Sequence, residues 1–582
     1  MRPIDSDSIR TLTAALEGMD DFVFLETCRM SEENYRSFLL TNPVRRLECS
    51  GDDSVFEFLD RAEACRQQGY FLAGWFDYEF GYLLEPALRD LARSGERNRI
   101  LAMLGVFEEV LIYNHATGSF SGGHGWPTAE PVEQACTVDN LQTNITEHEF
   151  LAGVEKIQRY IRAGDTYQVN YTFKLDFSCT GSAAALYRRL RQNQSVAYGA
   201  WIRYKGQDIM SFSPELFFAA DHRSVRVRPM KGTASRGKDA AEDQYRKALL
   251  AGDAKSRSEN VMIVDLLRND LARLLHKTGG GRVRVRSLFD VETYESLLQM
   301  TSTIEGRSTA DRMIGLKDML GSLFPCGSVT GAPKIRTMEI IRELETESRG
   351  VYCGAIGFCS RDEMCFNVPI RTLVLESGRG KMGIGAGIVH DSDPESEWRE
   401  CLLKGRFLTH PQPEFQLIET LCWQPENGYI LLQEHLDRLT SSADYFFFQG
   451  NRQRVQTRLM EEENLFADTA MRVRLLLYKD GRIEVTSGPL VDPDPDQELP
   501  KVAFDQRKVD TDSPFFHHKT TMRELYTQAR QKAEHRGLHE ILFVNTRGEV
   551  TEGTISTLFV QINGRMYTPP ISCGLLPGTF RR

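Results

Sequence analysis

The chain has 582 residues, which is too long for a single hydrophobic core, so we expect two or three domains. Hydrophobic residues make up 41% and charged residues 26%, the balance of an ordinary soluble enzyme. A net charge of -10 argues against nucleic acid as the main partner. The N-terminal residues contain no apolar stretch of the kind that directs secretion, and no apolar run is long enough to span a membrane. We therefore expect a cytoplasmic protein with neither a nucleic-acid nor a membrane partner.

Short apolar runs and one helical segment fill the first part of the chain, and we interpret residues 1–130 as an N-terminal subdomain. The glycine-rich stretch 118–127 interrupts the pattern and is predicted to be a loop or linker. The cysteines, 12 in all, form no Cys-x-x-Cys pair, which favours free thiols over a metal site. Strands are predicted at residues 22–25, 71–79 and 102–107, and a helix at 53–67.

A well-defined helix is predicted to begin after Thr146. Thr146 and Glu149 have the spacing of a capping box, and Gly164 suits the C-terminal cap. Apolar residues at helical spacing fall on one face, namely Phe150, Val154, Ile157 and Ile161. This helix opens a second domain, which we place at residues 145–410.

Strands and helices alternate through the rest of the chain. In the second domain, strands are predicted at 167–173, 209–212, 224–228 and within 350–390, and helices at 259–275 and after Asp393-Pro394. The proline-containing stretch 409–413 marks the next boundary. A new pattern follows it, with a predicted strand at 415–421 and a helix at 432–445, and we assign residues 414–582 to a third domain.

Lys231 lies in the stretch Pro229-Met230-Lys231-Gly232-Thr233, at the end of an alternating strand. Residues 210–215 and 225–231 have the pattern of two arms of a hairpin, which would bring Glu215 close to Lys231. The spacing by itself favours a cross-strand salt bridge between the two side chains.

An acid beside an amine also permits chemistry, because the acid can protonate a leaving hydroxyl while the amine attacks. Attack requires a lysine with a lowered pKa. Arg228 and Arg236 are close to Lys231 in the sequence, and their charges would favour such a shift.

Glu397, Glu400 and Lys404 fall on one face of the helix that follows Pro394. Such a face is most often simply solvated. The functional alternative is a Mg²⁺ site made of one or two of these carboxylates with Glu259 from the earlier helix, since few hard oxygen ligands suit magnesium that also holds a substrate.

Two glycine-rich stretches do not match nucleotide-binding motifs. Residues 383–389 lack the spacing of a dinucleotide fingerprint. Their glycines would allow a substrate carboxylate to approach the backbone N–H groups, but the pattern alone favours tight sheet packing. Residues 324–334 lack the Gly-Lys-Ser/Thr ending of a phosphate loop.

A series of motifs occurs in one order along the second domain: Ser213-Pro214-Glu215, Pro229 to Thr233, Glu259 to Asp270, Phe324 to Lys334, Ile370-Arg371-Thr372, Gly385 to Val389 and Asp391 to Pro394. Together they resemble the chorismate-binding enzyme family over roughly residues 145–410. The resemblance implies an α/β fold, a sandwich of two large antiparallel sheets with helices outside.

The lysine points to one branch of that family. Aminodeoxychorismate synthases carry Pro-Ile-Lys-Gly-Thr, whereas anthranilate synthases usually have alanine at the lysine position. The resemblance therefore implies that Lys231 attacks ring carbon 2 of chorismate, Glu215 acts as the general acid for loss of the 4-hydroxyl, and ammonia adds at carbon 4. An anthranilate or salicylate-type synthase is the alternative within the family.

Further roles follow from the resemblance alone. Magnesium ligands are implied at Glu259 and Glu400, with Glu397 beside them, and chorismate-binding groups at Arg371, Lys404, Tyr352, Gly385 and Thr233. Gln299 replaces a histidine that many anthranilate synthases carry. No glutamine amidotransferase domain is visible, so a separate glutaminase subunit is expected to supply ammonia. Phe24 to Thr27 resembles the segment that binds tryptophan in relatives, but we predict no tryptophan site from it.

The last domain carries motifs at His435 to Leu439, His518 to Thr521, Glu552 to Ser556 and Leu576 to Thr579. In this order they resemble fold-type IV pyridoxal-phosphate enzymes, a family that includes aminotransferases and aminodeoxychorismate lyase. The resemblance implies that Lys519 binds the cofactor covalently, that Glu552 faces its pyridinium nitrogen, and that Arg438, Ser556 and Thr579 contact its phosphate.

Fusion of the two domains favours a lyase that converts the first domain's product to 4-aminobenzoate and pyruvate, a step towards folate. The alternative is a non-catalytic scaffold. The chain stops soon after the last phosphate motif, where relatives continue, so we expect a shortened domain.

Overall fold

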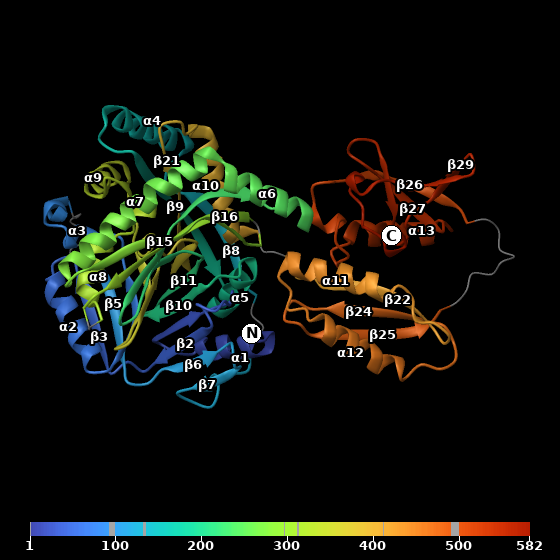
Figure 1. The fold of residues 1–582 in the computed structure, drawn as a ribbon, viewed down its shortest axis with the longest axis horizontal. Coiled ribbons are helices and arrows are strands. Elements are labelled where there is room, and N and C mark those ends of the chain that lie inside the picture. The colour runs from blue at the N-terminus through green and yellow to red at the C-terminus, as the bar shows by residue number, and fades with distance from the viewer. Residues whose placement is uncertain are drawn as a thin grey trace. The chain divides into compact units, whose positions relative to one another are not determined.

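The computed structural model describes residues 2–91, 99–131, 135–295, 297–310, 313–410, 413–490 and 500–581. The chain divides into two compact units (Figure 1). Unit 1 comprises Met1–Ala234 and Leu249–Gln412, and unit 2 comprises Ser235–Ala248 and Pro413–Arg582. Among the described residues, no helix has the length and apolar character needed to cross a membrane.

Two large antiparallel sheets form unit 1, and the strands of the first include those around residues 170 and 385. Its neighbouring strands pair as β17-β9-β21-β20-β11-β10-β1-β2-β6-β7, with β8 on β9. In that order their bounds are Gly331–Ala332, Gln168–Thr180, Arg379–Ile388, Thr372–Glu376, Gln207–Ser213, Tyr198–Tyr204, Phe22–Glu26, Arg36–Thr41, Leu111–Asn114, Ser119–Ser121 and Thr137–Thr143.

The second sheet carries Lys231 on its terminal strand. Its order is β14-β16-β13-β12-β19-β18-β4-β5-β3, with β15 on β16. The bounds are Met230–Ser235, Leu297–Ser308, Ser224–Arg228, Leu216–Ala220, Met364–Asn367, Ala355–Cys359, Phe71–Phe76, Ile100–Phe107, Arg45–Ser50 and Gly281–Thr293. Strands from the first 130 residues take part in both sheets, so this segment has no sheet of its own among the described residues.

The predicted hairpin of residues 210–215 with 225–231 is wrong in its first arm. β11 ends at Ser213 and belongs to the first sheet, whereas β12 pairs with β13 in the second. Pro214 explains the break, because proline has no N–H to give to a ladder. Pro229 separates β13 from β14 in the same way, so Lys231 begins a new strand.

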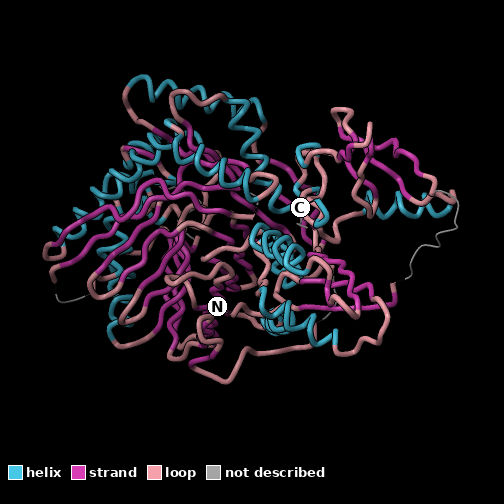
Figure 2. Tube along the Cα trace, turned by 45° about the vertical axis from the view of Figure 1, so that its right-hand side comes forward, coloured by secondary structure: helices cyan, strands magenta, loops and turns pink. Residues whose placement is uncertain are grey.

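Helices cover the outer faces of the two sheets (Figures 1 and 2). α7 packs on β15 and β16, and α2 on β3 and β4, whereas α10 and α4 contact β21 and α9 contacts β9. The predicted sandwich with outer helices is thus confirmed. The helices are α1 (Ser6–Glu17), α2 (Val55–Gln67), α3 (Phe80–Leu84), α4 (Glu147–Ala163), α5 (Ala183–Asn193), α6 (Ala240–Gly252), α7 (Ala254–Lys277), α8 (Leu316–Leu323), α9 (Lys334–Leu344) and α10 (Pro394–Thr409).

Local sequence signals account for the ends of two of these helices. Thr146 and Glu149 make the predicted capping box on α4, and Gly164 closes the helix in the left-handed conformation with φ 82°. Asp393 caps α10 by accepting from the Ser396 N–H at 2.8 Å.

Apolar side chains of both sheets meet in the interior of unit 1. One buried cluster joins Ile202 and Ile209 of the first sheet to Trp75 and Phe358 of the second. Burial of such side chains between two faces is the main force that holds the sheets together. The strand ends that carry the polar residues described below lie on this scaffold.

Unit 2 has its own core around an antiparallel sheet in the order β23-β22-β24-β25. A second sheet, β26-β27-β28, pairs β26 with β27 in parallel, and β29 pairs with β30. The bounds are β22 (Leu417–Gln424), β23 (Gly428–Tyr429), α11 (Leu432–Phe446), α12 (Arg452–Glu463), β24 (Met471–Leu477), β25 (Ile483–Pro489), β26 (Val502–Val509), α13 (Glu524–His535), β27 (Glu540–Asn545), β28 (Val550–Gly553), β29 (Val560–Ile562) and β30 (Arg565–Tyr567).

Candidate active sites

Glu215 is buried at the point where the chain crosses from β11 to β12. Ser328 Oγ donates a hydrogen bond to Glu215 Oε1 at 2.6 Å, and the Met230 N–H also donates to this carboxylate. Burial is the largest effect and raises the pKa of Glu215 to about 7, against these hydrogen bonds and the charge of Lys231, which lower it. A carboxyl group with this pKa can give up a proton near neutral pH.

Lys231 lies close enough to Glu215 for the two charges to affect each other. Burial lowers the pKa of Lys231 below its usual value, while the carboxylates of Glu259 and Glu215 act in the opposite direction. Lys404 supplies a cation that lowers this pKa further. A larger fraction of Lys231 is therefore neutral, as an amine nucleophile requires.

The two arginines considered from the sequence are held elsewhere. Arg228 Nη2 donates to Glu33 Oε2 at 2.6 Å, and Arg236 Nε donates to Asp243 Oδ2 at 2.7 Å. Each guanidinium is thus paired with a carboxylate of its own.

Gln299 holds the residues of β14 that follow Lys231. Its Nε2 donates to the Gly232 carbonyl at 2.9 Å, and Thr233 Oγ1 donates to its Oε1 at 3.1 Å. Gly232 has φ 88°, a conformation that favours glycine. Thr233 is therefore turned towards Gln299 in this structure, and Gln299 has a positioning contact that the sequence left unassigned.

Gln168 is a residue that the sequence reasoning missed. It is fully buried at the start of β9, and neither amide atom has a hydrogen-bond partner among the described residues. A Cβ added at Gly387 on the paired strand β21 would lie 2.9 Å from Gln168 Nε2 and 3.0 Å from Lys231 Nζ. An unpaired buried amide is costly, so this one suits a ligand at Lys231. The sequence predicted a strand at 167–173 but could not show that the amide of Gln168 is buried and unpaired.

Lys404 reaches β21 from α10. Its Nζ donates to the Gly385 carbonyl at 2.9 Å and forms an ion pair with Glu400 Oε1 at 2.8 Å. These contacts bring the predicted residues Lys404, Gly385 and Glu400 together. Against burial, which raises it, the charge of Lys404 is the main cause that lowers the pKa of Glu400.

The carboxylates implied as magnesium ligands are Glu259 and Glu400, with Glu397 beside them. Among the described residues, no group of three or more His, Cys, Asp or Glu side chains is arranged to hold a metal ion. Ser392 Oγ donates to Glu397 Oε1 at 2.8 Å, so this carboxylate has a structural partner within its own helix cap. Glu259 and Glu400 both act on Lys231 electrostatically, and this pair retains the hard oxygen atoms that suit magnesium.

Arg371 and Tyr352 occupy different surroundings. Arg371 has one terminal nitrogen, Nη1, that is buried without a partner among the described residues, and burial lowers its pKa to about 10. Such a guanidinium suits a carboxylate ligand. Tyr352 lies against Gly383 and lines a cavity of about 430 Å³ with Lys174 and Lys381, whose lining does not include Lys231.

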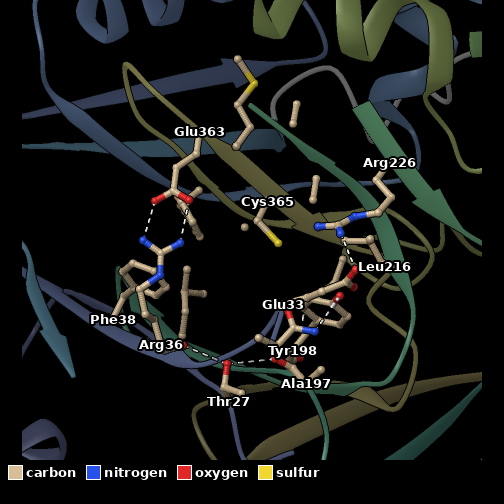
Figure 3. A pocket seen from close by; sticks show the side chains of 18 of the residues that line it. Thr27, Glu33, Arg36, Phe38, Ala197, Tyr198, Leu216, Arg226, Glu363 and Cys365 are labelled. Carbon is tan, nitrogen blue, oxygen red and sulfur yellow. Dashed lines mark hydrogen bonds and ion pairs between the residues drawn. The ribbon is translucent and has the colours of Figure 1, made fainter. Parts of the chain in front are cut away.

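A smaller cavity of about 180 Å³ lies where Thr27 meets Tyr198 and Arg36 (Figure 3). Arg36 and Glu363 face each other on one side of it and are joined by hydrogen bonds of 2.6 and 2.7 Å, while Arg226 contacts Glu33 on the other. Its cations are thus neutralised by neighbouring carboxylates.

Unit 2 contains a large cavity of about 1140 Å³. The residues predicted to hold pyridoxal phosphate all line it: Lys519, Glu552, Arg438, Ser556 and Thr579. Burial lowers the pKa of Lys519 to about 8, and the charges of Arg438 and Arg523 act in the same direction against that of Glu419. Burial raises the pKa of Glu552 to about 7. The cavity, its amine and its carboxyl group fit the cofactor.

Several residues that the sequence did not single out hold these groups in place. Arg438 donates to Glu419 through Nε at 2.9 Å and Nη2 at 2.6 Å, and His435 also contacts Glu419 at 2.7 Å. Tyr526 donates to Glu552 Oε1 at 2.8 Å. Ser556 Oγ is directed to Glu540, at 2.8 Å, rather than being free. Glu419 and Tyr526 are separated from their partners in the sequence, so only the fold reveals them.

The fold and these two sites identify the class of protein. Residues 21–410 match the chorismate binding enzyme family, and residues 416–582 match the amino-transferase class IV family. The chain belongs to the chorismate binding enzymes and carries a class IV aminotransferase domain in addition.

Known proteins of two kinds align with it. It is 42% identical over 293 residues to anthranilate synthase component 1 of Streptomyces coelicolor, covering 50% of this chain and 56% of that protein. It is 34% identical over 339 residues to aminodeoxychorismate synthase component 1 of Escherichia coli, covering 56% of this chain and 74% of that protein. Anthranilate synthase component I from Streptococcus pneumoniae is structurally similar, with a TM-score of 0.56 at 25% identity, covering 66% of this chain and 93% of that one.

Proposed function

We propose that unit 1 aminates chorismate at carbon 4, as an aminodeoxychorismate synthase component 1. The observation that carries the proposal is the pairing of Lys231, whose pKa is lowered, with the buried carboxyl group of Glu215, whose pKa is about 7. An amine nucleophile and an acid that can give up a proton are the two groups that such a displacement requires.

In this proposal Lys231 Nζ attacks ring carbon 2 while Glu215 gives its proton to the departing 4-hydroxyl group. Ammonia then adds at carbon 4 and the bond to Lys231 breaks. Ser328 holds Glu215 in place through the hydrogen bond at Oε1. Arg371 and the unpaired amide of Gln168 are available to hold polar groups of the substrate.

Glu259 and Glu400 are the carboxylates that would hold a magnesium ion, which would supply positive charge for the substrate's carboxylates. Glu397 is not included among these proposed ligands, because its carboxylate already accepts a hydrogen bond from Ser392. A separate glutamine amidotransferase subunit is proposed as the source of ammonia, consistent with the component 1 relatives.

Unit 2 is proposed to release 4-aminobenzoate and pyruvate from the product of unit 1. Pyridoxal phosphate, when bound, would supply an electron sink. Lys519 lies where it can take up and return a proton, since burial keeps its pKa at about 8. Glu552 presents a carboxyl group to the same cavity, and Arg438 and Thr579 line it as candidate phosphate ligands.

Product identification tests both proposals. The full chain would be incubated with chorismate, ammonia, magnesium and pyridoxal phosphate, and the products separated by chromatography. We expect 4-aminobenzoate and pyruvate. Anthranilate as the sole aromatic product would refute the assignment and support the alternative, which the 42% identity to an anthranilate synthase component favours. 4-Amino-4-deoxychorismate without 4-aminobenzoate would refute the lyase activity and leave a scaffold role for unit 2.

A further inference from the structure

The sheet of unit 2 presents two arginines to the cavity that holds Lys519. β24 alternates, and its residues Val473, Leu475 and Leu477 belong to the apolar core. Arg472 and Arg474 therefore point to the opposite face, because successive side chains of a strand alternate. Both arginines line the cavity.

Small neighbours leave these guanidinium groups uncovered. Arg474 lies opposite Thr420 on β22 and Thr486 on β25, and Arg472 lies opposite Cys422 and Gly488. All four neighbours line the same cavity. Both arginines are thus surrounded by small residues and remain exposed.

In the described part of the chain, the guanidinium groups of Arg472 and Arg474 have no hydrogen bond or ion pair with another residue. The other arginines of the cavity differ. Arg438 is bound to Glu419, Arg530 donates to the His539 carbonyl at 2.6 Å, and Arg523 donates to the Thr554 carbonyl.

Charge in this part of the cavity is one-sided. The charge of Arg474 adds to burial in lowering the pKa of the Arg523 guanidinium, so the two cations are near each other. Both glutamates of the lining are already engaged, since Glu552 accepts from Tyr526 and Glu534 is paired with Arg530. Clustered cations of this kind are relieved by an anion, and a guanidinium can bind a carboxylate through two parallel hydrogen bonds.

We propose that Arg472 and Arg474 form a subsite for a substrate carboxylate that is remote from the amino group reacting at Lys519. The inference rests on the proposed lyase function and specifies its substrate class, an amine that carries a distant carboxylate. 4-Amino-4-deoxychorismate has this chemistry. An amino acid with an apolar side chain does not, because it would leave two charged groups against an apolar surface.

The test uses the full chain loaded with pyridoxal phosphate. Arg472→Gln and Arg474→Gln each remove one charge and keep the length and polarity of the side chain approximately the same. Arg482→Gln is the matched control, since Arg482 is an exposed arginine of the same sheet region that stacks on Tyr478 and does not line the cavity. Arg474→Lys restores the charge without the paired donors.

Two measurements are made on each variant. The first is steady-state release of 4-aminobenzoate from 4-amino-4-deoxychorismate. The second is the Kd of 4-aminobenzoate by equilibrium dialysis, with the uncharged 4-aminobenzamide as a second probe. Both Gln variants are expected to raise KM and the Kd of 4-aminobenzoate by about 10- to 100-fold, with a smaller change in kcat. Cofactor affinity, measured by absorbance titration, and the Kd of 4-aminobenzamide should not change.

Arg482→Gln should behave as the wild type, and Arg474→Lys should recover part of the affinity. Unchanged KM and Kd in both Gln variants would overturn the subsite, as would an equal loss of 4-aminobenzamide binding. The proposed lyase can fail separately: a wild-type chain that binds 4-aminobenzoate through these arginines but releases none from the substrate would refute the lyase and keep the subsite.

Discussion

Single side chains decide the chemistry at Lys231. The Lys231→Ala variant removes the proposed nucleophile, so we expect amination of chorismate with free ammonia to fall by at least about 1,000-fold. Lys205→Ala is the control, because Lys205 is exposed and paired with Glu48. Chromatographic quantification of the aminated product checks this. Full activity in Lys231→Ala would remove this lysine from the mechanism.

The pH dependence follows from Glu215. A general acid must be protonated, so its contribution is present below its pKa of about 7 and is lost as the pH rises through that value. Lys231 must be neutral, so its contribution grows with pH, and burial shifts this rise to a lower pH than usual. We expect a bell-shaped profile of kcat/KM for ammonia-dependent turnover. In Glu215→Gln the fall near pH 7 should disappear, and rates should drop by about 100-fold or more. An unaltered alkaline limb in that variant would assign the titration to another group.

At the scale of elements, strand β21 places Gly387 beside Gln168 and Lys231. In Gly387→Ala the new methyl group would meet Gln168 Nε2 at 2.9 Å and Lys231 Nζ at 3.0 Å. The two side chains must move, so we expect activity to fall by about 10-fold or more while the melting temperature stays close to the wild type. Gly252→Ala is the control, because no atom lies within 4 Å of its added Cβ. Activity equal to the wild type in Gly387→Ala would show that the space beside Lys231 is not constrained.

Whether a feature of the fold can be predicted from the sequence depends on how far apart in the chain the interacting residues lie. The capping box of α4 depends on residues a few positions apart and agrees with the structure, and the helix predicted after Asp393-Pro394 begins at Pro394. The first arm of the hairpin was misplaced because β11 and β12 are adjacent in sequence but pair in different sheets. Sequence pattern alone does not show which sheet a strand joins.

The same limit applies within the sites. Lys231, Glu215 and the residues predicted around pyridoxal phosphate stand in motifs, so they were found from the sequence. Gln168 was missed because its importance lies in having no hydrogen-bond partner for its buried amide. Glu419 was missed because its partner comes from a helix that the sequence alone does not place beside it. The resemblance implied Glu259 and Glu400 as metal ligands with Glu397 beside them, but it could not show that Ser392 donates a hydrogen bond to Glu397.

At the scale of the whole molecule, two chemistries are proposed in one chain and should be separable by mutation. In Lys519→Ala, unit 1 is intact while the proposed cofactor lysine is absent. We expect 4-amino-4-deoxychorismate to accumulate at the wild-type rate while release of 4-aminobenzoate falls by about 1,000-fold or more. Time courses of both compounds from chorismate and ammonia check this. Equal 4-aminobenzoate release by the variant would mean that unit 2 does not carry the lyase step.

Unit 2 is discontinuous, since Ser235–Ala248 belongs to it although the chorismate-binding match surrounds this segment in the sequence. Arg236 Nη2 donates to the Tyr445 carbonyl at 3.1 Å, and Tyr445 Oη donates to the Gly237 carbonyl at 2.6 Å. A chain that ends at residue 412 would keep Ser235–Ala248 but lose the partners of this segment in residues 413–582. In a calorimetric scan we expect this shortened chain to melt at a lower temperature than the full chain. The same melting temperature for unit 1 in the shortened and the full chain would contradict this expectation.

In many two-domain proteins each domain is a continuous segment, so one domain can be exchanged for a homologous one at a single junction. Here the chain leaves unit 1 at the end of β14, soon after the lysine motif, and contributes a segment to unit 2. It returns to unit 1 just before the helix that carries Glu259. Replacing residues 413–582 by the corresponding domain of another protein would therefore also require replacing the internal segment Ser235–Ala248. Substitutions in these two parts of the sequence have to remain compatible with each other.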